Sequence, residues 1–115
     1  MGKSLGEFEQ MILFALISLG DEAYGAAIRR EIVYRTGRNV SAGAVYTVLD
    51  RLERSGMVAS RIGAPTSERG GRRRKHYAIR PDGARLLAAA RKRMHRMEQG
   101  LLDQLDDLSA AEGEA

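Results

Sequence analysis

The segment from Ser41 to Ile79 constrains the fold more than any other part of the chain. It begins with SAGAVYTVLDRLERSGMV, whose apolar residues have the spacing of a helix, and continues through a glycine-containing basic loop, ERGGRRRK, into the strand-like KHYAI. A compact helix beside a cationic hairpin can lie in one groove of a DNA duplex while the hairpin reaches toward the next. The segment therefore points to nucleic acid before any other kind of partner.

The helical part of this segment has one apolar face and one polar face. Ser41 is a suitable N-cap, and Val45, Val48, Leu49 and Leu52 follow at the i, i+3, i+4, i+7 spacing of a buried stripe. Small residues begin the other face and would let the backbone approach a duplex closely. We predict DNA contacts from six residues of this helix: Ser41, Ala42, Gly43, Tyr46, Thr47 and Arg51.

Two features leave the role of this helix open. Its polar residues would equally suit the solvent face of an ordinary surface helix. Asp50 also lies on that face, and a carboxylate is unfavourable beside phosphates unless it pairs with Arg51 or Arg54. The sequence therefore leaves the role of Asp50 undecided.

The basic loop strengthens the nucleic-acid interpretation. Residues 58–62 alternate as in a strand, and Tyr77 and Ile79 share a face of the returning strand, so a β-hairpin with a long tip is expected. Between residues 61 and 80 there are seven Lys or Arg residues and one acid, Glu68. Arginine is favoured in narrow minor grooves, although a run of bases can also be a solvated loop. The predicted DNA contacts of the hairpin are Arg69, Arg72, Arg73, Arg74 and Lys75.

Two further helices are expected before this segment. Residues 7–19 are apolar nearly all round, so a helix there must be covered on more than one side. One cover is the core of the domain, and the other could be a partner subunit. After the break at residues 20–22, a second helix is expected from Gly25 to Arg35, with Ile28 and Ile32 buried and Gly37 at its end.

The C-terminal part has the pattern of a long helix that needs a partner. Pro81 suits a first helical position, and a helix from there to Leu108 would measure roughly 40 Å. Apolar residues recur every seven positions on this helix, as in a coiled-coil seam, although Gly100 weakens the seam and Gln104 interrupts it. A stripe this long has no cover within so small a domain, which favours a second copy. The seam consists of Leu87, Ala90, Met94, Met97, Leu101 and Leu108.

Composition excludes several other classes of protein. The 115 residues suffice for one domain, and the six acids from Glu98 onward leave 19 bases against nine acids in the preceding part, a net charge of +10.

There is no cysteine, and His76 and His95 are the only histidines, so neither a metal site nor another cofactor is expected. No Ser, His and acid set or carboxylate pair has a catalytic spacing, so enzymatic activity is not expected. Without an apolar run of membrane length or a signal peptide, we expect a cytoplasmic protein.

The order of helices and strands predicts a fold that is mainly α with a small β-hairpin. We expect a winged helix-turn-helix domain at residues 1–80, a long C-terminal dimerisation helix at residues 81–108 in the same structural unit, and a disordered tail at residues 109–115.

Three parts of the chain resemble the PadR family of bacterial transcriptional regulators. They are LGEFEQMILFALISLGDEAYGAAIRREI, VSAGAVYTVLDRLERSGMV and ERGGRRRKHYAIRPDGARLL, which together cover nearly the whole sequence. The resemblance implies a dimeric winged-helix repressor that binds an operator with inverted half-sites, with Tyr46 on a backbone phosphate and the wing in the minor groove or on the flanking backbone. The chain departs from the family pattern at His76, where an aromatic residue is usual, and at Arg80, where a threonine usually caps the last helix.

The resemblance is to the short subfamily with a single C-terminal helix. It implies that Phe8, Met11 and Ile12 pack against the last helix of the partner, and some relatives bind drugs or phenolic compounds at the dimer interface. A small-molecule effector is therefore a possible partner, beside double-stranded DNA and a second copy of the chain. The full predicted dimer interface is Phe8, Met11, Ile12, Leu87, Met94, Met97, Leu101, Leu105 and Leu108.

One alternative function belongs to a different class. Winged helices also dock on protein partners, and the first and last helices carry ample apolar surface, so a protein-interaction module without DNA binding is the competing hypothesis. Such a module has no need of seven positive charges on its hairpin. The wing therefore discriminates between the two functions, and it favours DNA.

Overall fold

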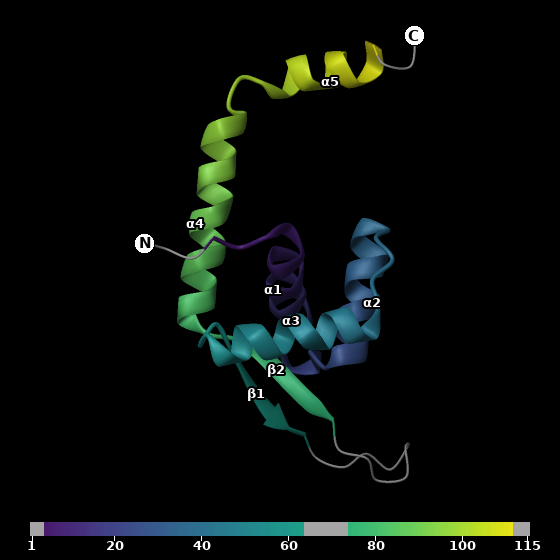
Figure 1. The fold of residues 1–115 in the computed structure, drawn as a ribbon, viewed down its shortest axis with the longest axis vertical. Coiled ribbons are helices and arrows are strands. Elements are labelled where there is room, and N and C mark those ends of the chain that lie inside the picture. The colour runs from purple at the N-terminus through teal and green to yellow at the C-terminus, as the bar shows by residue number, and fades with distance from the viewer. Residues whose placement is uncertain (1–3, 64–73, 112–115) are drawn as a thin grey trace.

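The fold is mainly helical, with one small antiparallel hairpin, as predicted (Figure 1). The computed structural model describes residues 4–63 and 74–111. No helix in these two ranges is long and apolar enough to span a membrane. The elements in chain order are α1 (Glu7–Leu19), a single 3₁₀ turn (Gly20–Glu22), α2 (Gly25–Thr36), α3 (Ala42–Arg54), β1 (Val58–Ile62), β2 (Lys75–Ile79), α4 (Pro81–Glu98) and α5 (Leu102–Ala111).

The boundaries of α2 and α3 follow from local chemistry. Gly37 ends α2 with a φ of 71°, a left-handed conformation that glycine adopts without steric cost. The Ser41 hydroxyl oxygen accepts a hydrogen bond from the Ala44 amide at 3.1 Å, which confirms Ser41 as the N-cap of α3. The apolar stripe predicted for α3 is buried as expected, at Val45, Val48, Leu49 and Leu52.

The core lies where α1, α2 and α3 meet the hairpin and the first part of α4. Helix α1 buries Ile12 and Leu13 completely but leaves Phe14 46% exposed and Ile17 55% exposed. The expectation that α1 has more apolar surface than one core can cover is therefore confirmed. The hairpin contributes Val58 and Tyr77 to the core.

The hairpin is joined to the start of α2. Strands β1 and β2 pair antiparallel, with Val58 opposite Ile79 and Ile62 opposite Lys75. In addition, the Tyr77 amide donates to the Ala23 carbonyl at 2.8 Å, and Tyr24 forms an isolated bridge with His76. The wing is therefore fixed to the helix-turn-helix through this short third segment, which the sequence did not predict.

Close backbone contact fixes the start of α4. Pro81 begins the helix, and Arg80 at the N-cap makes no capping hydrogen bond with its side chain, as expected from the missing threonine. A Cβ atom on Gly83 would lie 2.3 Å from the Met57 carbonyl oxygen. Glycine at this position therefore lets α4 approach the turn that leads into β1.

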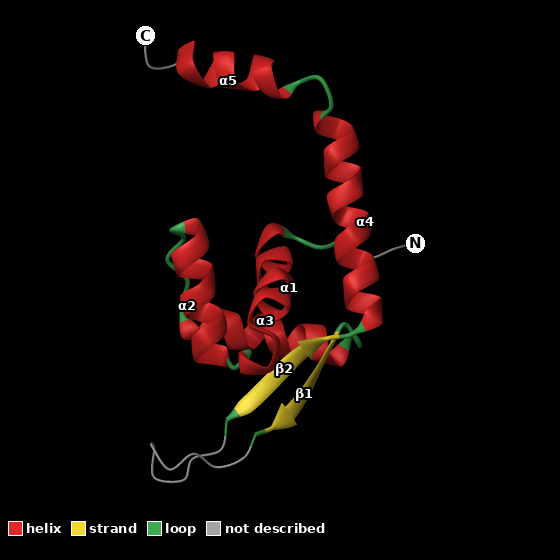
Figure 2. Cartoon of the chain, turned by 180° about the vertical axis from the view of Figure 1, so that it is seen from behind, coloured by secondary structure: helices red, strands yellow, loops and turns green. Residues whose placement is uncertain are grey.

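The prediction of one continuous helix to Leu108 is wrong. Helix α4 ends at Glu98, and Gly100 has a φ of 77°, a left-handed conformation that cannot continue an α-helix. Helix α5 then leaves in a new direction, and it projects from the rest of the molecule together with the C-terminal part of α4 (Figure 2). The heptad stripe is divided between two helices as a result. Residues 109–111, expected in a disordered tail, belong to α5, and residues 112–115 lie outside the described part.

Candidate nucleic-acid interface

The outer face of α3 is open to solvent. Ala42, Gly43 and Thr47 are exposed, and a Cβ atom on Gly43 would meet nothing within 4 Å. Figure 1 shows α3 at the end of the molecule from which the hairpin extends, with α5 at the opposite end. A helix with small residues and a clear outer face is the shape that enters a major groove.

Tyr46 lies against the first turn of α2. A Cβ atom on Gly25 would come within 2.2 Å of the Tyr46 hydroxyl oxygen and 2.3 Å of the ring. Glycine at position 25 is therefore required for this contact, which explains why glycine follows Tyr24 at the start of α2. Tyr46 nevertheless remains 46% exposed, so it can still meet a ligand.

A hollow of about 570 Å³ separates the first turns of α2 and α3. Such first turns leave backbone amides unpaired and favour an anion. Arg29 at its edge donates from Nε to the Val40 carbonyl at 2.7 Å and so fixes the connection between the two helices. Three of the predicted DNA contacts gather in this hollow. Its lining is Ala26, Arg29, Arg30, Ser41, Ala42 and Tyr46.

Arg51, another predicted DNA contact, faces a carboxylate of the protein. Its Nη2 atom lies 3.5 Å from Glu9 Oε2 on α1, and its side chain is 50% exposed. This ion pair holds Arg51 at the edge of the outer face of α3. To contact DNA as predicted, Arg51 must therefore leave Glu9 or share its guanidinium between Glu9 and the DNA.

Glu53 connects α3 to both strands of the hairpin. The Ser60 hydroxyl donates to Glu53 Oε2 at 2.5 Å, and Lys75 Nζ lies 3.4 Å from Glu53 Oε1. The hydrogen bond from Ser60 is the largest cause that lowers the pKa of Glu53, and the charge of Lys75 adds to it against the opposing effect of burial. Sequence analysis missed Glu53, although its position on the third helix ahead of a predicted strand was visible.

The charge of Lys75 is partly balanced within the protein. The pKa of Lys75 is raised, first by Tyr77 and then by the carboxylates of Glu53 and Asp50. Asp50 therefore acts electrostatically on the wing lysine, which bears on the question that the sequence left open. Both acids favour the charged form of Lys75, but their negative charges weaken the net positive field that it presents to a phosphate.

Tyr24 gathers three basic side chains where the hairpin meets α2. Arg74 Cζ lies 4.2 Å from the centre of the Tyr24 ring, and Arg30 Nη2 donates to the Tyr24 hydroxyl at 3.0 Å. The His76 ring packs against the Tyr24 ring at 5.7 Å in an edge-on arrangement. A Cβ atom on Gly63 would lie 2.8 Å from the His76 ring, so glycine makes room for the histidine. Sequence analysis did not include Tyr24 among the predicted DNA contacts.

The remaining predicted wing contacts, Arg69, Arg72 and Arg73, lie outside the described residues. Arg74 and Lys75 are the two members of the predicted set that the structure describes, and they face different groups, Tyr24 and Glu53 respectively.

The comparisons with known proteins agree with this geometry. A family model for the transcriptional regulator PadR-like family matches residues 13–89, which extend from α1 into α4. The chain belongs to this family. The resemblance read from the sequence is confirmed, and transcription regulation is the activity of the family. No curated protein matches the chain.

Several solved structures share the PadR-like fold of this chain. A PadR-like transcriptional regulator from Bacillus cereus strain ATCC 14579 is 22% identical with a TM-score of 0.69, over 85% of this chain and 90% of that one. A transcriptional regulator from Clostridium thermocellum is 26% identical with a TM-score of 0.65, over 79% and 85%. A PadR family transcriptional regulator from Eggerthella lenta DSM 2243 is 26% identical with a TM-score of 0.64, over 86% of each chain.

The surfaces expected to form the dimer of this PadR-like protein differ in exposure. Ile12 is completely buried and Leu87 is 4% exposed, so both belong to the core of the protomer rather than to a surface that a partner could reach. Phe8 and Met11 are partly buried, and Phe8 is covered by Arg38, whose Cζ lies 5.1 Å from the ring centre. The other predicted residues are about half exposed or more: Met94, Met97, Leu101, Leu105 and Leu108.

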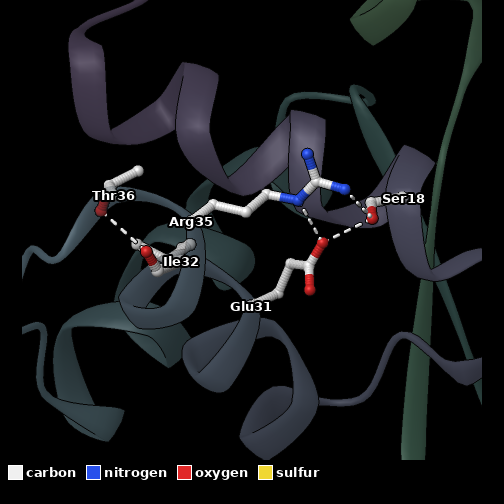
Figure 3. A network of polar contacts seen from close by, with 5 residues as sticks. All are labelled: Ser18, Glu31, Ile32, Arg35 and Thr36. Atoms are coloured by element: carbon white, nitrogen blue, oxygen red, sulfur yellow. Dashed lines mark hydrogen bonds and ion pairs between the residues drawn. The ribbon is translucent and has the colours of Figure 1, made fainter.

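An open apolar groove of about 620 Å³ runs between α1 and α2. Phe14 and Ile17, which the predicted interface omitted although they stood in the apolar run, line it together with Met11. Figure 3 shows the polar network at its edge, where Glu31 accepts hydrogen bonds from Ser18 and Arg35, each at 2.5 Å. Both bonds lower the pKa of Glu31, that of Ser18 more.

Proposed function

We propose that this protein is a homodimeric, sequence-specific DNA-binding repressor that binds an inverted-repeat operator. The observation that carries the proposal is the open, small-residue face of α3 between the anion-favouring hollow and the basic hairpin. Membership of a family of transcriptional regulators supports the same function.

Each part of this surface fits one part of a duplex. The outer face of α3, with Gly43 and Thr47, is suited to reading base edges in the major groove. The hollow beside Tyr46 is suited to a backbone phosphate. The hairpin, which carries Arg74 and the basic residues of its tip, is suited to the adjacent minor groove or its flanking phosphates.

The dimer is supported by apolar surface that the protomer leaves open. Phe14 and Ile17 on α1 and Leu105 and Leu108 on α5 are each between 46% and 64% exposed, and burying such side chains against a second copy would stabilise the assembly. Residues 81–111 would then form the dimerisation part. A two-fold arrangement would space two α3 helices roughly 34 Å apart, about one turn of DNA.

Charge distribution supports the same assembly. Residues 91–96 of α4 include four exposed Lys or Arg side chains, and α5 exposes three acids. In a dimer, α5 of one protomer could lie beside α4 of the other with opposite charges facing each other. The four bases are Arg91, Lys92, Arg93 and Arg96, and the three acids are Asp103, Asp106 and Asp107.

The test is selection of DNA fragments followed by affinity measurement. The full-length protein is mixed with random duplexes, the retained fragments are sequenced, and the affinity for the selected and a scrambled duplex is measured by fluorescence anisotropy at several salt concentrations. We expect an inverted repeat, tighter binding of the selected duplex, and affinity that falls steeply with salt. Equal affinity for selected and scrambled duplexes would contradict the proposal.

Repression itself is tested with a reporter gene placed behind the selected sequence. We expect expression to fall when the protein is present. A small-molecule effector that relieves the repression would need a pocket, and the groove between α1 and α2 has the size that such ligands occupy. Expression that rises with the protein would indicate an activator instead.

The exposed apolar residues of α1 and α5 also support a second candidate, a protein-interaction module without DNA binding. Sedimentation velocity and anisotropy separate the two functions. A stable dimer or complex with no affinity for any duplex at low salt would favour the interaction module.

A further inference from the structure

Tyr24 lies where the helix-turn-helix and the wing are joined. Its backbone pairs with His76 of β2, and the neighbouring Ala23 carbonyl accepts the Tyr77 amide. The Tyr24 side chain is partly buried between the start of α2 and the end of the hairpin. A side chain that contacts Tyr24 is therefore held in a fixed position relative to both the helix-turn-helix and the wing.

Two arginines from different parts of the chain meet at this ring. Arg30, one turn into α2, donates to the Tyr24 hydroxyl at 3.0 Å, and its Cζ atom lies 5.8 Å from the ring centre. Arg74, at the end of the hairpin loop, places its Cζ atom 4.2 Å from the same centre, a cation–π distance. One aromatic ring thus brings together a cation of the helix-turn-helix and a cation of the wing.

The backbone of Arg74 is fixed as well as its side chain. Its carbonyl accepts the Gly63 amide at 2.7 Å and lies 3.2 Å from His76 Nδ1. The Arg30 guanidinium is held by its hydrogen bond to the Tyr24 hydroxyl, and that of Arg74 by its contact with the Tyr24 ring. Neither guanidinium therefore has to give up much freedom in order to bind an anion, which favours affinity.

Neither Arg30 nor Arg74 has a carboxylate partner among the residues that the structure describes. In residues 4–63 and 74–111, five Lys or Arg side chains form ion pairs, and neither Arg30 nor Arg74 is among them. Two guanidinium groups that approach one ring without an acid repel each other. An anion that bound between them would relieve this repulsion. The paired cations are Arg35, Arg38, Arg51, Lys75 and Arg85.

Arg30 also lines the hollow between α2 and α3, together with Ser41 and Tyr46. The arginine pair therefore lies next to the site that favours a phosphate for independent reasons. Guanidinium groups match phosphate oxygens with two parallel hydrogen bonds, and they remain charged at all relevant pH values.

We propose that Arg30 and Arg74 form a two-armed clamp for the phosphate backbone of one DNA strand, and that Tyr24 is the positioning residue that sets its geometry. This inference rests on the DNA-binding function proposed above. It assigns DNA contact to Arg30 on α2 and makes the wing and the helix-turn-helix grip the same stretch of backbone.

A double-mutant cycle tests the clamp. Affinities of the selected and scrambled duplexes are measured for the wild type, Arg30→Ala, Tyr24→Phe and the double variant. We expect Arg30→Ala to weaken both duplexes by about tenfold and to reduce the salt slope by about one for each bound half-site. Tyr24→Phe keeps both charges and the ring but removes the hydroxyl that orients Arg30, so we expect a loss of about threefold with an unchanged slope. In the Arg30→Ala background, Tyr24→Phe should have no further effect.

Arg74 is tested with Arg74→Lys and Arg74→Ala. Lysine keeps the charge but not the planar fork, so we expect Arg74→Lys to keep the salt slope and lose about threefold in affinity, while Arg74→Ala loses about tenfold and flattens the slope. Tyr34→Phe, on the same helix as Arg30 and 87% exposed, is the matched tyrosine control. Arg85→Ala, in the first turns of α4 and with a side chain that is 72% exposed, is the matched charge control. Both controls should bind both duplexes as the wild type does.

Several outcomes overturn the clamp. If the wild type binds DNA but Arg30→Ala leaves affinity and salt slope unchanged, the clamp is wrong while the proposed function stands. If Tyr24→Phe costs the same with and without Arg30, its hydroxyl does not position that arginine, and the proposal fails. A wild type without affinity for any duplex overturns the proposed function and the clamp together. Circular dichroism melting of every variant identifies losses that come from unfolding, and a variant that melts like the wild type but binds weakly supports the clamp.

Discussion

Helices α3 and α5 have the same kind of sequence pattern and opposite surroundings. Both are amphipathic, yet α3 buries Val45, Leu49 and Leu52 almost completely, whereas α5 buries none of its residues. The covering surface of α3 comes from its own chain. Helix α5 has no such cover among the described residues, so periodicity predicted which residues are apolar on each helix but not whether the same chain covers them.

The largest expected effect tests this difference directly. Leu49→Ala removes a completely buried side chain from α3 and should lower the free energy of unfolding by about 2–5 kcal/mol. Leu105→Ala changes a side chain on α5 that is 57% exposed, so in a monomeric sample it should cost less than about 0.5 kcal/mol. Urea denaturation at low protein concentration measures both.

The same pair of variants also distinguishes the proposed dimer. Sedimentation velocity should show Leu105→Ala dissociating at a higher protein concentration than the wild type, since it removes apolar contact area from the partner. If Leu105→Ala destabilised the monomer as much as Leu49→Ala, α5 would have to pack on its own chain. Helices α3 and α5 would then both be covered by their own chain.

The contact between Tyr46 on α3 and Gly25 on α2 also positions α3. Gly25→Ala would place a Cβ atom 2.2 Å from the Tyr46 hydroxyl oxygen, so the tyrosine ring must move. Because Tyr46 is half exposed, we expect only about 1 kcal/mol of lost stability but about tenfold weaker DNA binding. Thermal melting and fluorescence anisotropy measure the two effects.

Gly43→Ala serves as the matched control for Gly25→Ala. Its Cβ atom would meet nothing within 4 Å, and alanine favours a helix, so the melting temperature should not fall. DNA binding by Gly25→Ala at the level of the wild type would remove the contact between α2 and Tyr46 from the interface.

The parts of the fold that the sequence predicted well are those decided by nearby residues. The bounds of α1, the N-cap of α3 and the end of α2 at Gly37 all follow from local pattern and backbone preference. The basic hairpin was located for the same reason. Local chemistry does not depend on which distant segments come together.

The parts of the fold and of the interface that the sequence did not predict depend on contacts between residues far apart in the chain. Tyr24 meets Arg74 across fifty positions of sequence, and Glu53 meets Lys75 across twenty-two. The pattern at each position alone indicates only an aromatic residue or an acid. Gly100 is the intermediate case, because the sequence marked it as a weak point and the left-handed backbone turned that weakness into a break.

Gly100→Ala tests whether the glycine backbone sets the direction of α5. Alanine disfavours the φ of 77° that the break requires, by about 1 kcal/mol, so the variant should shift α4 and α5 toward a single helix. Since the protein has no cysteine, spin labels at Lys92→Cys and Asp107→Cys report on this region alone. We expect the distance between the labels to lengthen and the helical signal of circular dichroism to rise. An unchanged distance would mean that contacts other than the glycine backbone hold α5 in its direction.

The smallest expected effect concerns the polar contact that fixes α3 to the hairpin, for which α5 has no counterpart among the described residues. Ser60→Ala removes the hydrogen bond that most lowers the pKa of Glu53. A carboxyl whose pKa is lowered in the folded protein contributes stability above its ordinary pKa and loses it as the pH falls through the folded value. Ser60→Ala should therefore cost less than about 1 kcal/mol at neutral pH, since Glu53 is partly exposed.

This cost should shrink as the pH falls below the ordinary pKa of a glutamate carboxyl and through the lowered pKa of Glu53 in the folded protein. Urea denaturation of the wild type and Ser60→Ala at a series of pH values measures it. The control is Ser55→Ala, because the Ser55 hydroxyl donates to the Arg51 carbonyl at 2.7 Å and that backbone acceptor does not titrate. The cost of Ser55→Ala should be the same at every pH. If both serine variants gave the same pH-independent loss, Ser60 would not act through the charge of Glu53.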